Sequence, residues 1–221
     1  MPNLSTSPRA LAQLQVDEFL RKLAGSDPTP GGGSAAALGG AIAASLVTMV
    51  AGLTVGKPGF EEVSESLELL AEQGHQIAET LVGAIDRDAA AYDGVTAAFK
   101  LPKGTDEEKS ERSAAIQHAM KAAAEVPLEV ATECLAAAEL ALVALEKGNP
   151  NACTDAGSGL LFALAGLESA VLNVAVNLDS IKDAGYVAEQ KAEIAELLAR
   201  AAELRSTVWS NLRPRLASLP S

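Results

Sequence analysis

The sequence predicts an all-α fold, a single-domain multi-helical bundle of about six helices formed by residues 1–221, with its core over about 17–212. Apolar residues recur at helical spacings of three and four nearly throughout, and no segment alternates as a half-buried strand does. Hydrophobic residues make up 48% of the chain but aromatic residues only 3%, so Ala, Leu, Val and Gly must fill the interior. Their small side chains allow helix axes to approach closely. No linker-like change in composition divides the chain.

Glycine and proline residues mark the ends of the expected helices. Gly25 and Pro28 end the first helix, Gly56 and Pro58 end the second, and Pro102 follows the third. The helices are therefore expected over residues 9–24, 34–55, 60–99, 106–147, 154–183 and 187–212.

The fourth helix carries both a start signal and a break signal. Thr105 and Glu108 have the spacing of a capping box at its start. Pro127 lies in its interior and is expected to kink or interrupt it, because proline has no backbone N–H. The turn Gly148-Asn149-Pro150-Asn151 then separates it from the fifth helix.

The second helix belongs to a run without charges from Gly31 to Gly56 that is long enough to raise the possibility of a membrane span. Most of its residues are small, and its few large apolar residues recur at spacings of three and four. This pattern is typical of a helix buried on all sides inside a soluble bundle. The surfaces of the second and fifth helices are small and apolar, so we expect a homodimer that covers both and no membrane partner.

Charge and residue content exclude several function classes. The net charge of −12 disfavours nucleic acid and anionic membrane surfaces as partners. Cys134 and Cys153 have no CxxC spacing and no signal peptide is present, which predicts a cytoplasmic protein. His75 and His118 lack a ligand-spaced partner, so no metal site is expected.

The most informative segment is Asp27-Pro28-Thr29-Pro30-Gly31-Gly32-Gly33-Ser34. Three glycines let a ligand approach the backbone or permit positive φ, and Ser34 is expected to cap the helix that follows. Such a helix start suits an anion or a polarised carbonyl. The segment matches neither GxGxxG nor GxxxxGK[ST], so a nucleotide loop is not predicted. The alternative is an ordinary Pro/Gly helix boundary.

Asp88 occupies a core position on the third helix, between Ile85 and Tyr92 on the apolar stripe. A buried carboxylate is costly unless it is paired or hydrogen-bonded. Asp88 could hold a lysine or arginine of a neighbouring helix, or it could be a desolvated acid–base group.

Four further polar residues fall near the apolar helices. Asp155 lies in the first turn of the fifth helix, where it is either an ordinary helix-start residue or a second catalytic carboxylate. Asn173 and Asn177 share one face and need partners, either across a helix contact or on a ligand. Lys57 either complements the end of the second helix or supplies a cation or proton at a pocket edge.

Taken in order, these motifs resemble the formiminotransferase-cyclodeaminase C-terminal domain family, which includes formimidoyltetrahydrofolate cyclodeaminases and methenyltetrahydrofolate cyclohydrolases. The resemblance covers roughly residues 17–185. It rests on Asp27-Pro-Thr-Pro-Gly-Gly-Gly-Ser34 with Leu53-Thr-Val-Gly-Lys57, on Gly148-Asn-Pro-Asn-Ala-Cys-Thr-Asp155, and on Asn173-Val-Ala-Val-Asn177. Asp88 and Val126-Pro127-Leu128 fit the middle of the family pattern.

The resemblance implies an all-helical homodimer with a tetrahydrofolate derivative in a cleft lined by the glycine turn. It implies a cyclodeaminase that converts 5-formiminotetrahydrofolate to 5,10-methenyltetrahydrofolate and ammonia, or alternatively a cyclohydrolase. That chemistry needs an acid and a base but no metal or nucleophilic side chain. The expected catalytic residues are Asp88, Asp155 and Lys57, and the expected substrate-binding residues are Pro30, Gly31, Gly32, Gly33, Ser34, Asn173 and Asn177. A non-catalytic folate-binding or structural bundle stays open as another class.

Overall fold

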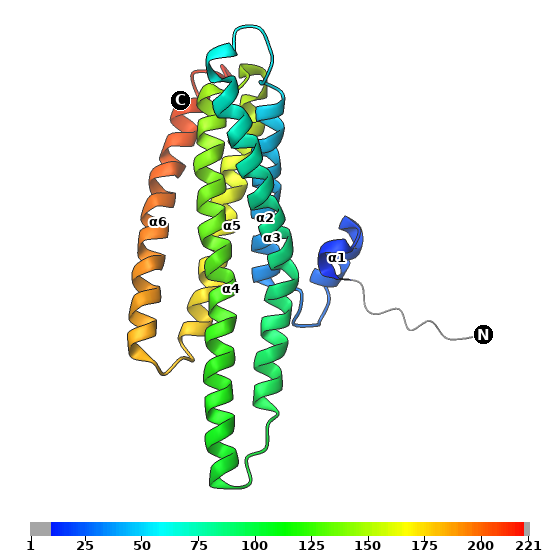
Figure 1. Cartoon of the computed structure of the whole chain (residues 1–221), viewed down its shortest axis with the longest axis vertical. Coiled ribbons are helices and arrows are strands. Elements are labelled where there is room, and N and C mark those ends of the chain that lie inside the picture. Colours follow the sequence, from blue (N-terminus) through cyan, green and yellow to red (C-terminus); the bar gives the residue numbers. More distant parts are fainter. Residues whose placement is uncertain (1–9, 219–221) are drawn as a thin grey trace, which may run out of the picture.

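A computed structural model describes residues 10–218, which contain six α-helices. The long helices α2 to α6 form an elongated bundle, and the short α1 lies to one side of it (Figure 1). The all-α prediction is confirmed, because no strand occurs within those residues. The helices are α1 (Val16–Leu23), α2 (Gly32–Gly52), α3 (Ser64–Phe99), α4 (Asp106–Lys147), α5 (Cys153–Leu178) and α6 (Ala184–Leu212).

Several helix ends differ from the prediction. The expected first helix divides into a short 3-10 helix, η1 (Leu11–Gln13), and α1, and residue 9 lies outside the described residues. The capping box of α1 uses Gln15 and Glu18, so this helix has its own start signal. Helix α2 begins two residues earlier than expected, and α5 ends at Leu178 rather than 183 because a turn intervenes before α6.

Helix α4 is continuous through Pro127, so of the two expected outcomes, a kink or an interruption, the interruption is wrong. The lost N–H leaves the carbonyl of Ala123 without its helical donor, and the Asn177 side chain of α5 donates to that carbonyl at 2.9 Å. The predicted capping box at the start of α4 is confirmed, since Thr105 Oγ1 accepts from the amide of Glu108 at 3.2 Å.

Small residues hold α2 and α5 at the centre of the bundle. Gly40 of α2 and Gly166 of α5 face Cys134 of α4, and a Cβ on Gly166 would lie 2.9 Å from the Cys134 sulfur. Buried alanines on all three helices complete this contact. The Ala- and Gly-rich composition therefore serves close helix packing, as predicted from the few aromatic residues.

The apolar stripe of α3 is buried along its first two thirds and opens at Asp88. Leu67, Leu81 and Ile85 are buried, whereas Tyr92 is 45% exposed. Beyond this point α3 and α4 extend past the start of α2 as the lower hairpin in Figure 1. The stripe thus leaves the core at the place where α2 begins.

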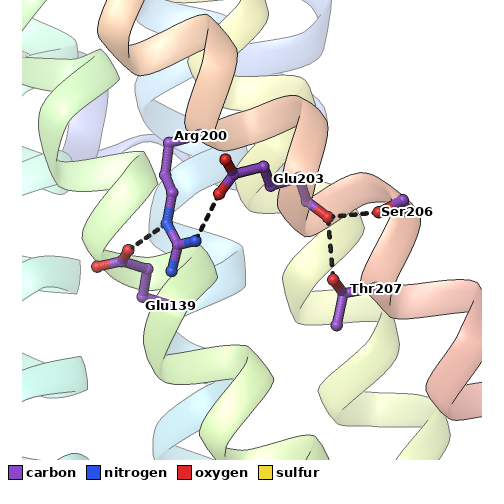
Figure 2. A network of polar contacts seen from close by, with 5 residues as sticks. All are labelled: Glu139, Arg200, Glu203, Ser206 and Thr207. Carbon is purple, nitrogen blue, oxygen red and sulfur yellow. Dashed lines mark hydrogen bonds and ion pairs between the residues drawn. The ribbon is translucent and has the colours of Figure 1, made fainter.

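Helix α6 covers the outer side of α4 and α5. Arg200 of α6 donates to Glu139 of α4 at 2.9 Å and to Glu203 of its own helix at 2.8 Å (Figure 2). The hydroxyls of Ser206 and Thr207 donate to the backbone carbonyl of Glu203. These exposed contacts stabilise the bundle little, and burial of Leu197, Leu204 and Val208 holds α6 in place.

Two helical segments, Gly32–Gly52 and Pro150–Leu178, are long and apolar enough to cross a membrane by length and composition. Half of each apolar window is buried inside the bundle. Core helices of soluble proteins pass the same test.

Candidate functional site

A cavity of about 390 Å³ lies where α2 begins and α5 ends, above the hairpin of α3 and α4. It gathers residues from the segment before α2, from four helices and from the turn after α5. Its lining consists of Pro28, Thr29, Gly31, Gly32, Gly33, Asp88, Tyr92, Val95, Met120, Ala123, Asn173, Val176, Asn177 and Ser180. A larger and more open depression beside α1 contains none of the predicted site residues.

Ser34 does not cap α2, contrary to the expectation. The helix begins at Gly32 with Gly31 in the cap position, and no side chain caps it. Ser34 is fully buried in the first turn, where its Oγ donates to Asp88 Oδ2 at 2.9 Å and to the carbonyl of Ile85 at 3.1 Å. This hydroxyl therefore positions the Asp88 carboxylate, because the first turn of α2 packs directly against α3.

The glycines of the turn are needed for close approach and not for positive φ. Within residues 10–218, the only residues with positive φ are Gly56 and Gly59. A Cβ on Gly33 would overlap the Asp88 carboxylate, and one on Gly32 would lie 3.1 Å from Asn173 Nδ2. The absence of these two side chains lets α3 and α5 bring polar groups against the start of α2.

Asp88 is a half-buried carboxylate. No ion pair within residues 10–218 includes it, so within one chain Asp88 does not hold a lysine or arginine of a neighbouring helix. The neighbouring Arg87 points elsewhere and binds Glu129 at 2.6 Å. Burial raises the pKa of Asp88 above its ordinary value of 3.8, while hydrogen bonds from the Ser34 hydroxyl and amide act in the opposite direction.

Asp88 therefore lies at the helix start that the sequence predicted to suit an anion or a polarised carbonyl. It lies against the first turn of α2, where unpaired N–H groups and the helix dipole favour negative charge. Burial and the dipole act against each other on its ionisation. A carboxylate in this balance can accept a proton and release it again, which general acid–base catalysis requires.

Asn173 and Asn177 both line the cavity, and both contact backbone carbonyls. Asn173 Nδ2 donates to Ser169 O at 2.8 Å. Asn177 Nδ2 donates to Asn173 O at 2.8 Å and to Ala123 O at 2.9 Å. The amide nitrogens thus bond to helix carbonyls, as one alternative expected. The two side chains also line the cavity, where a ligand could contact them, as the other alternative expected.

The remaining predicted residues lie elsewhere. Pro30 is buried and does not line the cavity. Lys57 follows the far end of α2, and Asp155 lies in the first turn of α5 at that same end, where Asn149 binds Thr54 and Leu53. Asp155 and Asn173 are eighteen residues apart on α5, about 27 Å at about 1.5 Å per residue. One chain does not bring Lys57 and Asp155 to Asp88.

Tyr92, Val95 and Met120 line the cavity, but the sequence did not identify them as site residues. Tyr92 and Val95 continue the apolar stripe of α3 beyond Asp88. A signal was present in the sequence, because residues four and seven positions after Asp88 share its helix face. Met120 of α4 carried no such signal.

Within residues 10–218, the buried Cys134 thiol is the candidate nucleophile, and acidic, His and Cys side chains are the candidate metal ligands. Burial raises the pKa of the Cys134 thiol to about 12, so it carries no thiolate at neutral pH. Within residues 10–218, no group of three or more His, Cys, Asp or Glu side chains is placed to hold a metal ion. The expectation of a metal-free site remains a prediction.

A family model described as Formiminotransferase-cyclodeaminase matches residues 15–196. The chain belongs to this family. The resemblance inferred from the glycine turn and its companion motifs is therefore confirmed, over nearly the same range.

The chain is similar to proteins that carry two different functional names. A protein of Methylorubrum extorquens named methenyltetrahydrofolate cyclohydrolase is 43% identical over 91% of this chain and 97% of its own length. The formimidoyltransferase-cyclodeaminase of Sus scrofa is 34% identical over 95% of this chain, which spans only 39% of that protein. The crystal structure of formiminotetrahydrofolate cyclodeaminase from Thermotoga maritima matches with a TM-score of 0.82 and 28% identity, covering 91% of this chain and 97% of that one.

Proposed function

We propose that this protein is a folate one-carbon enzyme that hydrolyses 5,10-methenyltetrahydrofolate to 10-formyltetrahydrofolate in the cavity at the start of α2. The observation that carries the chemistry is the half-buried Asp88 carboxylate, unpaired and held by Ser34 on the cavity wall. The choice of reaction is supported by the 43% identity with a cyclohydrolase over 97% of that protein's length.

The proposed hydrolysis uses Asp88 first as a base and then as an acid. Ionised Asp88 takes a proton from water as the oxygen bonds to the cationic methenyl carbon between N5 and N10. The protonated carboxyl then gives its proton to N5 as the carbon–N5 bond breaks, which leaves the formyl group on N10. The hydroxyl proton of the intermediate passes to solvent. One proton is released for each turnover, and Asp88 returns to its ionised form.

Charge complementarity favours the methenyl substrate. Its reacting carbon is cationic, and the ionised Asp88 carboxylate faces the same cavity. Ser34 holds the carboxylate in one orientation, so little reorganisation is needed when the charge of the substrate changes. Tyr92, Val95 and Met120 offer apolar surface to a flat ring system.

The second candidate is the formimidoyltetrahydrofolate cyclodeaminase expected from the sequence, and the likeness to the Thermotoga maritima structure favours it. In that reaction N10 attacks the formimino carbon on N5, a base takes the N10 proton, and an acid protonates the nitrogen that leaves as ammonia. Asp88 can serve either step, so the residue types in the cavity suit both reactions.

The two reactions are separated by offering each substrate alone and following absorbance of the methenyl compound in the near ultraviolet. A cyclohydrolase speeds its loss from 5,10-methenyltetrahydrofolate beyond the uncatalysed rate. A cyclodeaminase produces it from 5-formiminotetrahydrofolate and releases ammonia. If neither substrate reacts although both bind, the protein is a folate-binding bundle and the proposal fails.

We further propose that the protein is a cytoplasmic homodimer joined through the exposed faces of α2 and α5, with neither lipid nor nucleic acid as a partner. Among their exposed residues only Glu168 is charged, and it binds Arg205 of α6. A long uncharged strip is typical of a subunit interface. The strip comprises Gly32, Ile42, Ser45, Met49 and Gly52 on α2 and Thr154, Ser158, Phe162, Ala165, Ser169, Leu172, Ala175 and Val176 on α5.

The position of the family motifs favours an antiparallel dimer. Lys57 and Asp155 lie at one end of the strip, and the Asp88 cavity lies at the other. A two-fold axis perpendicular to α2 and α5 would bring Lys57 and Asp155 of one subunit to the cavity of its partner. The three expected catalytic residues would then form one site from two chains.

A further inference from the structure

Pro127 creates an opening in the hydrogen bonding of α4 beside the cavity. It is buried inside the helix, four residues after Ala123. Because proline has no N–H, the Ala123 carbonyl has no donor within α4. Asn177 of α5 fills this position, since its Nδ2 donates to Ala123 O at 2.9 Å. Both Ala123 and Asn177 line the cavity.

This contact fixes which way the Asn177 amide faces. A side-chain amide has two N–H donors and one oxygen acceptor. The two donors of Asn177 go to the backbone carbonyls of Ala123 and Asn173. Among residues 10–218 the acceptor, Oδ1, has no hydrogen-bond partner, so it stays free to accept one. An exchange of the amide atoms would place oxygen against both carbonyls.

We propose that Pro127 is a positioning residue of the cavity: by freeing the Ala123 carbonyl, it anchors the Asn177 amide so that Oδ1 accepts a hydrogen bond from an N–H group of the ligand. The anchor stands on the geometry alone, whereas the ligand contact rests on the proposed folate function. Asn173 Nδ2 likewise donates to a backbone carbonyl, that of Ser169. The α5 wall then favours ring edges rich in N–H donors, such as that of a pterin ring.

The anchor is tested by a double-mutant cycle of Pro127→Ala and Asn177→Ala, with unfolding followed in urea. In the wild-type background Asn177→Ala strands the Ala123 carbonyl and should raise the unfolding equilibrium constant about tenfold. Pro127→Ala supplies the missing N–H from within α4, so in its background the same change should have an effect within about twofold. Equal effects in both backgrounds overturn the proposal.

Asn211→Ala is the matched control. Asn211 Nδ2 donates to Thr207 O at 3.1 Å on its own helix, where no proline is involved. Its effect should be the same with and without Pro127→Ala. A second measurement needs no proline variant: the Asn177 side-chain hydrogens should exchange with solvent much more slowly than those of a free amide, and equal exchange rates contradict the anchor.

The ligand contact is tested with 5,10-methenyltetrahydrofolate itself. Pro127→Ala should raise KM about tenfold with a smaller change in kcat, because it loosens an orienting side chain and leaves Asp88 in place. It should add no further change to KM when Asn177→Ala is present. A similar rise in both backgrounds means that Pro127 acts by another route. A wild-type protein inactive on both folates would refute the proposed function, while the unfolding cycle would still decide the anchor.

Discussion

Asp88 shows how one residue can follow from sequence while its surroundings do not. Its charge interrupts an apolar stripe of α3, so its burial could be predicted from spacing alone. Its partner could not, because Ser34 was expected to cap α2. The helix begins earlier at Gly32, which turns the Ser34 hydroxyl inward to Asp88. Residue types identified the carboxylate, and helix packing decided which hydroxyl holds it.

Gly33→Ala should disable the site through a single methyl group. The added Cβ would overlap the Asp88 carboxylate, so that side chain must move away from Ser34. We expect turnover to fall about tenfold or more, since acid–base groups depend on position. Gly83→Ala is the matched control. Gly83 lies on α3, the helix that carries Asp88, and a Cβ there would meet no atom within 4 Å. Equal turnover in the two variants would show that the close approach at Gly33 has no catalytic role.

The raised pKa of Asp88 predicts opposite effects of pH on activity and on stability. The base must be ionised, so activity should decline as pH falls through the raised pKa, which lies above 3.8. Asp88 binds its proton more tightly in the folded chain than in the unfolded chain, because its pKa is raised by folding. Stability from this group is therefore present at low pH and is lost as pH rises through that pKa. Urea unfolding of the wild type and of Asp88→Asn across pH should show a growing advantage of the variant as pH rises. A constant difference would mean that folding leaves the pKa unshifted.

At the scale of helices, glycine and proline located most boundaries, and the exceptions have physical reasons. The helix expected over 9–24 breaks because Leu11 and Ala12 donate their amides to Asp86 of α3, a long-range contact that local sequence does not reveal. Helix α4 continues through Pro127 because Asn177, fifty residues further along the chain, serves the freed carbonyl. Tertiary partners outweighed local signals in both cases.

The uncharged faces of α2 and α5 predict that one charge will separate the subunits. Leu172→Glu places a carboxylate at a position that is 71% exposed in one chain and buried in the proposed dimer. We expect the wild type to be dimeric by light scattering at micromolar concentration and this variant to be monomeric. Leu69→Glu is the control, at a position of α3 that is 56% exposed and outside the strip. A monomeric wild type contradicts the interface.

At the scale of the molecule, the helical bundle could be predicted from composition and periodicity, but the distribution of its site residues could not. The sequence identifies Lys57 and Asp155 as parts of the family motifs. It does not show that α2 and α5 run in opposite directions. The antiparallel packing sends these two residues to the far end of the bundle from Asp88. In the proposed dimer, the second subunit would bring them to Asp88.

A shared site predicts complementation between two inactive variants. Asp88→Asn and Asp155→Asn each damage both sites of their own homodimer. Refolding the two together gives heterodimers in which one site is intact, so about a quarter of wild-type activity should return. The control is each variant refolded alone. Full activity of Asp155→Asn by itself, or no recovery in a mixture that contains heterodimers, would place the whole site within one chain.

The central claim is that Asp88 performs the proton transfers, and Asp88→Asn tests it most directly. The substitution keeps the shape and an acceptor for Ser34 but removes the charge and the transferable proton. Turnover of whichever folate substrate the wild type accepts and melting temperature should be measured on the same preparation. The account predicts a fall in turnover of about 10²-fold or more with a melting temperature equal to or above that of the wild type. Near-normal turnover with a lowered melting temperature would contradict it and make Asp88 a structural residue.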